Sequence, residues 1–182
     1  MVPEVTPVVT VRTAVPGDAG ELLTVQWAAF VSEAQRYGDP LLPPLREDLD
    51  GVAAAIAEPS VIVLVALAGT RLVGSVRLRV EGAQGHVGRL AVAPDQQGRG
   101  IGSRLLAAAE NAAPYQVREF RLFTGADSLE NVARYERAGY LRTVPGVAKN
   151  GVAKNGVAEN GVAENGVDER GVGLVHLAKS RP

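Results

Sequence analysis

Residues 87–106 read VGRLAVAPDQQGRGIGSRLL, and this stretch decides the fold. It begins as an apolar strand at 87–92, breaks at a proline, passes three alternate glycines, Gly98, Gly100 and Gly102, and continues as a helix. Glycines let the backbone approach a ligand closely, and the free amides at a helix start favour an anion. The stretch therefore predicts a cradle for the pyrophosphate of a nucleotide-bearing cofactor. The alternative is a glycine-rich turn that holds no ligand.

Two other phosphate-binding patterns fit this stretch poorly. A P-loop ends in Gly-Lys-Ser/Thr, whereas the third glycine here is followed by Ser103 and Arg104. The dinucleotide pattern needs a glycine at the position of Ser103 and a place at the start of a parallel sheet. A nicotinamide-dependent oxidoreductase is therefore only the third function that we consider.

Composition narrows the class of protein further. The chain has 182 residues, the length of one ordinary domain, and no cysteine, which excludes disulfides, thiolate metal sites and a cysteine nucleophile. Two histidines, a net charge of -1 and 4% aromatic residues argue against a histidine-rich metal site and against a nucleic-acid partner. The start has no signal-peptide pattern, and the longest apolar run, residues 61–68, is too short to span a bilayer. We therefore expect a soluble cytoplasmic protein.

The order of the predicted elements favours an α+β, or mixed α/β, domain over a regular doubly wound sheet. The apolar run 61–68 predicts a strand that is covered on both faces. We expect strands at residues 8–13, 61–68, 71–80, 86–92, 119–124, 140–144 and 173–179. We expect helices at residues 19–36, 46–57, 100–112 and 129–137, with a loop at 37–44. Asp18 is expected to cap the first helix, whose inward positions are Leu22, Leu23, Val25, Trp27 and Phe30.

Residues 146–170 are five copies of a five-residue unit that begins with Gly-Val. A period of five matches neither a helix nor a strand, so its valines form no single apolar stripe. We interpret the segment as a low-complexity insertion between the last two strands of a single domain that covers residues 1–182. An expanded loop, a weak extension of the final hairpin and a short solenoid stay open.

The string from Leu90 to Leu106 resembles the acyl-CoA-binding signature of the GNAT superfamily of N-acetyltransferases. That signature is Gln/Arg-x-x-Gly-x-Gly/Ala, and Gln97, Gly100 and Gly102 meet it. The cofactor that this resemblance implies is acetyl-CoA.

Three further segments extend the resemblance to most of the chain outside the repeat. Residues 131–140 resemble the family's second cofactor-side motif, which ends in Tyr-Glu-x-x-Gly-Phe/Tyr. Residues 11–18 resemble its opening, and residues 174–179 its closing strand. The resemblance implies a GNAT-like domain with a mostly antiparallel, twisted sheet of about seven strands. This sheet splays at the cofactor site and is flanked by about four helices.

The resemblance also implies roles for the matching positions. The backbone of residues 90–92 would pair with the pantetheine arm like an added strand, and the amides of residues 98–103 would hold the pyrophosphate. Asn131 would hydrogen-bond the cofactor arm, and Tyr135 would protonate the leaving thiolate. The expected cofactor-binding residues are Leu90, Ala91, Val92, Gln97, Gly98, Arg99, Gly100, Ile101, Gly102, Ser103 and Asn131.

The general base stays open in the sequence. Many relatives place a glutamate at about the position of His86, but here no acid lies between Glu81 and Asp95. His86 is the candidate base because histidine titrates near neutrality; a water chain is an alternative, and so is a plain strand-end role for His86. His176 and Tyr140 are expected to pack in the interior.

The leading function is an N-acetyltransferase that moves an acetyl group directly to an amine of a small molecule or peptide. The alternative is a non-catalytic acyl-CoA-binding sensor or regulatory module. We expect no metal and no membrane partner, and consider a homodimer. The acceptor pocket is expected at the first two helices, the loop 37–44 and the last hairpin. Its polar residues are interpreted as solvated rather than as substrate ligands: Arg36, Tyr37, Asp39, Glu47 and Asp48.

Overall fold

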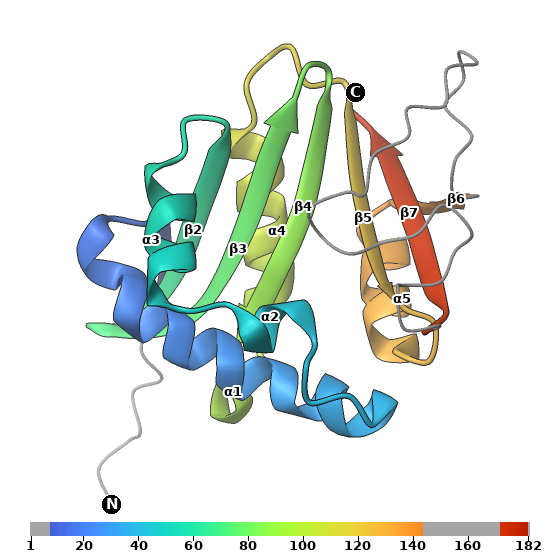
Figure 1. The fold of residues 1–182 in the computed structure, drawn as a ribbon. Coiled ribbons are helices and arrows are strands. Elements are labelled where there is room, and N and C mark those ends of the chain that lie inside the picture. Colours follow the sequence, from blue (N-terminus) through green and yellow to red (C-terminus); the bar gives the residue numbers. More distant parts are fainter. Residues whose placement is uncertain (1–7, 144–171, 182) are drawn as a thin grey trace, which may run out of the picture.

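The computed structural model describes residues 8–143 and 172–181, which form one open seven-stranded sheet with helices on both faces (Figure 1). The strands are β1 (Val9–Thr13), β2 (Val61–Ala68), β3 (Arg71–Glu81), β4 (Gln84–Val92), β5 (Glu119–Gly125), β6 (Leu141–Thr143) and β7 (Leu174–Ser180). The helices are α1 (Ala19–Tyr37), α2 (Pro43–Arg46), α3 (Leu49–Ala57), α4 (Ile101–Ala112) and α5 (Leu129–Arg137). Two 3-10 turns, η1 (Pro16–Asp18) and η2 (Pro94–Gln96), precede α1 and α4.

The sheet opens between its two central strands. The strands run in the order β1-β2-β3-β4-β5-β7-β6, and every neighbouring pair in the described residues is antiparallel except β4 and β5. These two pair in parallel only from Gln84↔Glu119 to His86↔Arg121 and then separate, as Figure 1 shows. The predicted mixed fold with a mostly antiparallel, splayed sheet is therefore confirmed.

A β-bulge lies on β4 where the strands separate. The register of β3 and β4 shifts between Ser75 and Arg77, so that one residue of β3 faces both Arg89 and Leu90. Arg89 has a φ of 51°, and among the described residues it is the one non-glycine residue with a positive φ. A bulge of this kind bends a strand and re-aims its side chains, and a strained backbone is often kept where a protein needs it.

Two apolar clusters pack against opposite faces of the sheet. On one face, Ile101 and Leu105 of α4 and Tyr135 of α5 join the cluster that contains Leu64 of β2. On the other, the buried residues of α1 and α3 pack with Val63 of β2. Strand β2 is thus covered on both faces, as its continuous apolar run predicts.

The buried face of α1 differs from the prediction. Leu22 and Leu23 are buried as expected, but Trp27 is 42% exposed and Gln26 is fully buried. Ala19, Leu22, Leu23 and Gln26 follow the i, i+3, i+4, i+7 spacing of one helix face, so helical geometry places the glutamine inside. A buried amide needs hydrogen-bond partners. The Gln26 nitrogen finds them in the segment after α1, where it donates to the Pro44 carbonyl at 2.9 Å and to Glu47 at 2.8 Å, whereas the Gln26 amide oxygen has no partner in the described residues.

The segments that flank α1 were also predicted incorrectly in part. The Asp18 side chain makes no capping bond to α1 but accepts from the Val15 amide at 2.7 Å. The segment predicted as a loop at 37–44 contains the start of α2, because a proline is compatible with a first helical turn. The helix predicted from residue 46 starts at Leu49, where Asp48 accepts from the Gly51 amide at 2.9 Å.

The pentapeptide repeat at 146–170 lies outside the described residues, as does residue 144 at the end of the strand predicted at 140–144. Within the described ranges, no helix is long and apolar enough to cross a lipid bilayer.

Candidate active site

The predicted cradle is a loop that leads into α4 and leaves its amides free. Gly98 has a φ of 75° and Gly100 a φ of 76°, left-handed values that favour glycine, and Gly100 is the N-cap of α4. The first amide that bonds back across the start of the helix is that of Arg104, to the Gly100 carbonyl. The described residues therefore provide no acceptor for the amides of residues 98–103, and these amides lie at the positive end of the helix dipole.

Side chains on both sides hold this loop in place. The Gln97 amide donates to the Val92 carbonyl at 3.1 Å, which ties the loop to the end of β4. Arg71 of β3 pairs with Asp95 of η2 at 2.6 Å, and the hydrogen bond from Arg71 holds the pKa of the Asp95 carboxyl well below 3.8. Ile101 is 2% exposed in the core, so only its backbone can face a ligand.

The edge of β4 beside this loop has no strand partner. The β4–β5 pairing ends at His86, so the β5-side backbone groups of residues 87–92 have no strand partner in the described structure, and among them the Val92 carbonyl accepts from the Gln97 side chain. An open strand edge of this kind is a template for an added extended segment. The open edge contains Leu90, Ala91 and Val92, and their pairing with a cofactor arm stays a prediction.

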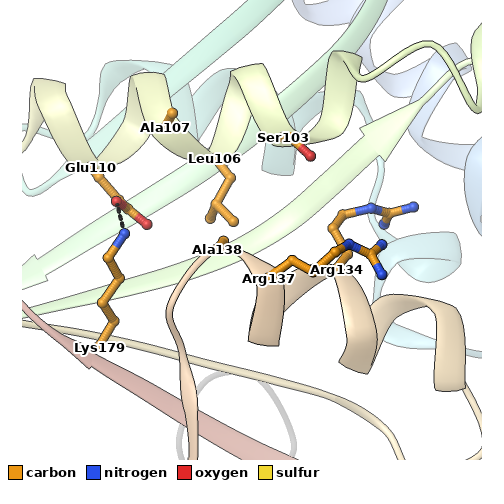
Figure 2. Close-up of a pocket in the computed structure, with 8 residues that line it drawn as sticks. All are labelled: Ser103, Leu106, Ala107, Glu110, Arg134, Arg137, Ala138 and Lys179. Atoms are coloured by element: carbon orange, nitrogen blue, oxygen red, sulfur yellow. Dashed lines mark hydrogen bonds and ion pairs between the residues drawn. The ribbon is translucent and has the colours of Figure 1, made fainter.

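Arginines of α5 face the start of α4, and the sequence analysis did not identify them. A Cβ built on Gly102 would lie 3.8 Å from Nε of Arg134. Figure 2 shows Arg134 and Arg137 extending from α5 near Ser103, along a cavity of about 270 Å³ between α4 and α5. The cavity is lined by Ser103, Leu106, Ala107, Glu110, Arg134, Arg137, Ala138 and Lys179. Both arginines lie within two residues of Tyr135 in the motif, and this charge could have predicted a positively charged surface beside the cradle. We call Arg134 and Arg137 together the cationic wall.

Asn131 belongs to a polar network that crosses the opening of the sheet. Its amide donates to Glu33 of α1 at 3.3 Å, and its carbonyl accepts from Arg134 at 2.8 Å. The hydroxyl of Ser128 donates to the same Glu33 at 2.5 Å. Because that hydroxyl is used as a donor, the Tyr37 phenol, 3.0 Å away, donates to Ser128 in turn. The end of α1 is thereby tied to the start of α5.

Tyr135 lies deep in the core between the two halves of the sheet. It is 8% exposed, and its ring meets that of Tyr140 edge-on at 6.2 Å. Burial raises the pKa of Tyr135 to about 12, so the phenol keeps its proton at neutral pH. A protonated phenol can donate but cannot act as a base, which fits the role of an acid.

His86 lies at the point where β4 and β5 part. Gly85 and Val87 on either side of it face the α4 core, so the imidazole points to the opposite face, which α1 to α3 cover. Its Nε2 lies 3.5 Å from Glu81. Burial lowers the pKa of His86 below 6.5 despite the opposing charge of Glu81, so the imidazole is neutral at pH 7.

His176 lies on β7 and has a packing contact rather than a polar one. Its ring centroid is 5.9 Å from that of Phe123, and its Nε2 is buried without a hydrogen-bond partner in the described structure. Tyr140 is 1% exposed and packs in the core, as predicted. The described residues contain no group of three or more side chains that could hold a metal ion.

Glu47 was interpreted as a solvated loop residue, and this was wrong. Arg77 donates to one of its carboxylate oxygens at 2.8 Å; Gln26 and Arg89 donate to the other at 2.8 and 3.3 Å. These four residues form what we call the Glu47 cluster. Burial alone would raise the pKa of Glu47, but the hydrogen bonds and charges of its partners outweigh it and hold this pKa below 4.5. The cluster joins α1 and the segment before α3 to the sheet.

Comparison with known proteins gives one family. A model of the acetyltransferase (GNAT) domain matches residues 46–154. A mycothiol acetyltransferase of Clavibacter michiganensis subsp. michiganensis is 40% identical over 125 residues, which are 68% of this chain and 39% of that protein. The mycothiol acetyltransferase of Clavibacter sepedonicus is also 40% identical over 125 residues, 68% of this chain and 40% of its own length. The chain therefore spans about two fifths of these curated relatives.

Solved structures share the fold at low sequence identity. The PaiA N-acetyltransferase of Thermoplasma acidophilum, in complex with coenzyme A, has a TM-score of 0.70 and 14% identity, over 96% of this chain and 99% of its own. YncA of Salmonella typhimurium, a putative acetyltransferase with acetyl-CoA, has a TM-score of 0.68 and 16% identity, over 95% and 94%. At these identities the likeness is one of fold alone.

Replacing Glu47 by Gln tests how much the Glu47 cluster contributes to the free energy of unfolding. The change leaves two partly buried guanidiniums without their anion, so the free energy of unfolding at pH 7 should fall by about 2–3 kcal/mol. Because the folded-state pKa of Glu47 is lowered, its contribution is present above pH 4.5 and is lost as the pH falls through the folded-state value. Denaturant unfolding at pH 7 and at progressively lower pH measures both effects.

The matched control is Glu136→Gln, because Glu136 pairs with Arg142 on the surface, where the Arg142 side chain is 61% exposed. This variant should unfold like the wild type. Equal stability of the two variants would contradict the assignment of Glu47.

Proposed function

The chain belongs to the GNAT family of acetyltransferases, whose cofactor is acetyl-CoA, and from this premise we propose that it transfers the acetyl group directly to a primary amine. The observation that carries the proposal is the open edge of β4, which leads straight to the free amides of residues 98–103. An extended arm that ends in a pyrophosphate suits both features at once.

The cofactor would lie along this edge with each part on a different kind of group. The backbone of residues 90–92 would pair with the pantetheine amides, and the amides of residues 98–103 would bind the pyrophosphate. Arg134 and Arg137 would add positive charge from α5. Asn131 would exchange its contact with Glu33 or Arg134 for one with the cofactor arm.

In the chemical step, the amine nitrogen attacks the thioester carbonyl carbon, the new C–N bond forms and the C–S bond breaks. Backbone amides beside the bulge would stabilise the oxyanion. Tyr135 would give its phenolic proton to the leaving thiolate and regain one from solvent. His86 would take the proton that the amine loses, because its lowered pKa keeps it neutral at pH 7.

The acceptor in this proposal is a small molecule. The support is that the two Clavibacter relatives are mycothiol acetyltransferases. Since the chain spans about two fifths of those proteins, their acceptor is not carried over to it.

The direct test measures acetyl-CoA binding by calorimetry and release of the free thiol of CoA with a panel of primary amines. Turnover with at least one amine supports the transferase. Tight binding of acetyl-CoA without turnover of any amine would favour the non-catalytic acyl-CoA-binding module instead.

Tyr135→Phe removes the proposed acid and little else. We expect kcat to fall by about 100-fold while the Kd for CoA changes by less than about twofold, because the lost group acts in the transition state. Tyr140→Phe is the matched control, since Tyr140 packs against Tyr135 and should not matter to turnover. An unchanged kcat in Tyr135→Phe would remove this residue from the mechanism.

His86→Gln tests the proposed base through the pH profile. In the wild type, kcat/KM calculated on the concentration of unprotonated amine should be level well above the lowered pKa of His86 and fall as the pH drops through it, because only the neutral imidazole accepts a proton. The variant should lose about 100-fold in kcat/KM and the acid limb with it. His176→Gln, which replaces the other histidine, should keep the wild-type kcat/KM and its acid limb. An acid limb in His86→Gln identical to that of the wild type would exclude His86 as the base.

Arg134→Gln tests the cationic wall. Loss of one charge-assisted contact to phosphate should raise the Kd for CoA about tenfold in calorimetry. Arg142→Gln removes an equal charge from a surface pair and should leave the Kd unchanged. Equal affinities of the two variants would show that Arg134 makes no contact with the cofactor.

A further inference from the structure

The Glu47 cluster carries more positive charge than it neutralises. Two guanidiniums, those of Arg77 and Arg89, share the single carboxylate of Glu47, and their side chains are only 15% and 17% exposed. The third partner, Gln26, is neutral and fully buried. The charges that act on Arg89 come from Glu47 and Arg77. One positive charge is therefore left over in a largely dry place, where an unpaired charge is costly.

The arginines also have donor groups to spare. Arg89 meets Glu47 through Nε alone, and Nε of Arg77 is buried with no hydrogen-bond partner in the described residues. A guanidinium presents a planar fork that matches a carboxylate, so spare nitrogens beside an excess charge are suited to a second carboxylate. A purely structural ion network would have no reason to keep them.

The position of the cluster points to the acceptor rather than to the cofactor. Arg89 lies on the bulge directly before Leu90, at the site where the thioester is proposed to lie. The cluster lies on the face that α1 and α3 cover, whereas residues 98–103 lead into α4 on the other face. The phosphates of the cofactor are thus bound across the sheet from these arginines.

We propose that the amine acceptor is a free amino acid whose carboxylate is bound by Arg89 and Arg77 beside Glu47. This inference rests on the proposed acetyl transfer. The carboxylate takes the charge that Glu47 leaves uncompensated, and it holds the neighbouring amine next to the bulge of β4. Arg89 and Arg77 act in this scheme as residues that select the substrate.

The surroundings of the cluster favour an acceptor with an apolar side chain. Trp27, 42% exposed, donates from its indole to the Glu47 carbonyl at 3.2 Å. Glu47 therefore contacts the two arginines through its side chain and the partly exposed ring of Trp27 through its carbonyl. L-Phenylalanine and L-leucine are the probes, because each combines a carboxylate for the arginines with an apolar side chain for Trp27.

The first experiment compares thiol release with L-phenylalanine and L-leucine against their amides, which lack only the charge. The acids should have kcat/KM values about tenfold above those of the amides. Intrinsic reactivity works the other way, because an amino acid amide holds more free amine at neutral pH. Amides that react as well as the acids would overturn the proposal.

Arg89→Gln should erase this preference by lowering kcat/KM for the acids about tenfold, with the amides and the KM for acetyl-CoA unchanged. A uniform loss for acids and amides would mean a structural role and would also overturn the proposal. Arg12→Gln, which removes an arginine from an exposed pair with Asp18, is the matched control and should keep the wild-type preference.

The second experiment needs neither turnover nor a variant. Calorimetry on the wild-type protein saturated with CoA compares N-acetyl-L-phenylalanine with N-acetyl-L-phenylalaninamide. Binding of the acid at least about tenfold tighter supports the carboxylate site even where no amine is acetylated, in which case the transfer reaction alone fails. Equal binding, or no binding of either, overturns the carboxylate site whether or not amines are acetylated.

Discussion

Strand β4 stays paired with β3 but separates from β5 after His86, and the rest of the site depends on this separation. A strand edge in the middle of a sheet normally satisfies its amides and carbonyls by pairing, so an edge left open there must be supported by other contacts. The bulge at Arg89 bends β4 at this point. Past it, the strand carries its open edge directly to the glycine loop and the start of α4.

Contacts on both faces of the sheet hold its two parts, β1 to β4 and β5 to β7, together across the opening. On the α4 side the apolar cluster is continuous from Leu64 on β2 to Leu177 on β7. On the other side, polar contacts bridge the gap: Glu33 reaches Ser128 and Asn131, and the Tyr37 phenol accepts from the Asp127 amide at 3.0 Å. The polar groups of such a bridge can take hydrogen bonds from a ligand in place of those to one another, which an apolar contact cannot do.

The sequence predicted the fold and the cofactor, because their signals are local. The alternate glycines that lead into a helix and the apolar run at 61–68 needed no knowledge of distant contacts, and α4 and β2 lie where they predict them. The binding of a pyrophosphate by the glycine loop stays a prediction. The Glu47 cluster could not be found in this way, since Gln26, Glu47 and Arg89 come together only when α1 packs on the sheet. The same holds for Arg134, whose place over Gly102 depends on how α5 packs beside α4. The mistake at Trp27 has a simpler cause, because neighbouring helical positions one residue apart differ sharply in burial.

The central claim is that acetyl-CoA occupies the opening between β4 and β5. Amide hydrogen exchange with and without saturating CoA tests it most directly. The claim predicts slower exchange on binding in two segments, residues 90–92 and 98–103, with β1 and β2 unchanged. Tight binding of CoA that leaves exchange in both segments unaltered would contradict it.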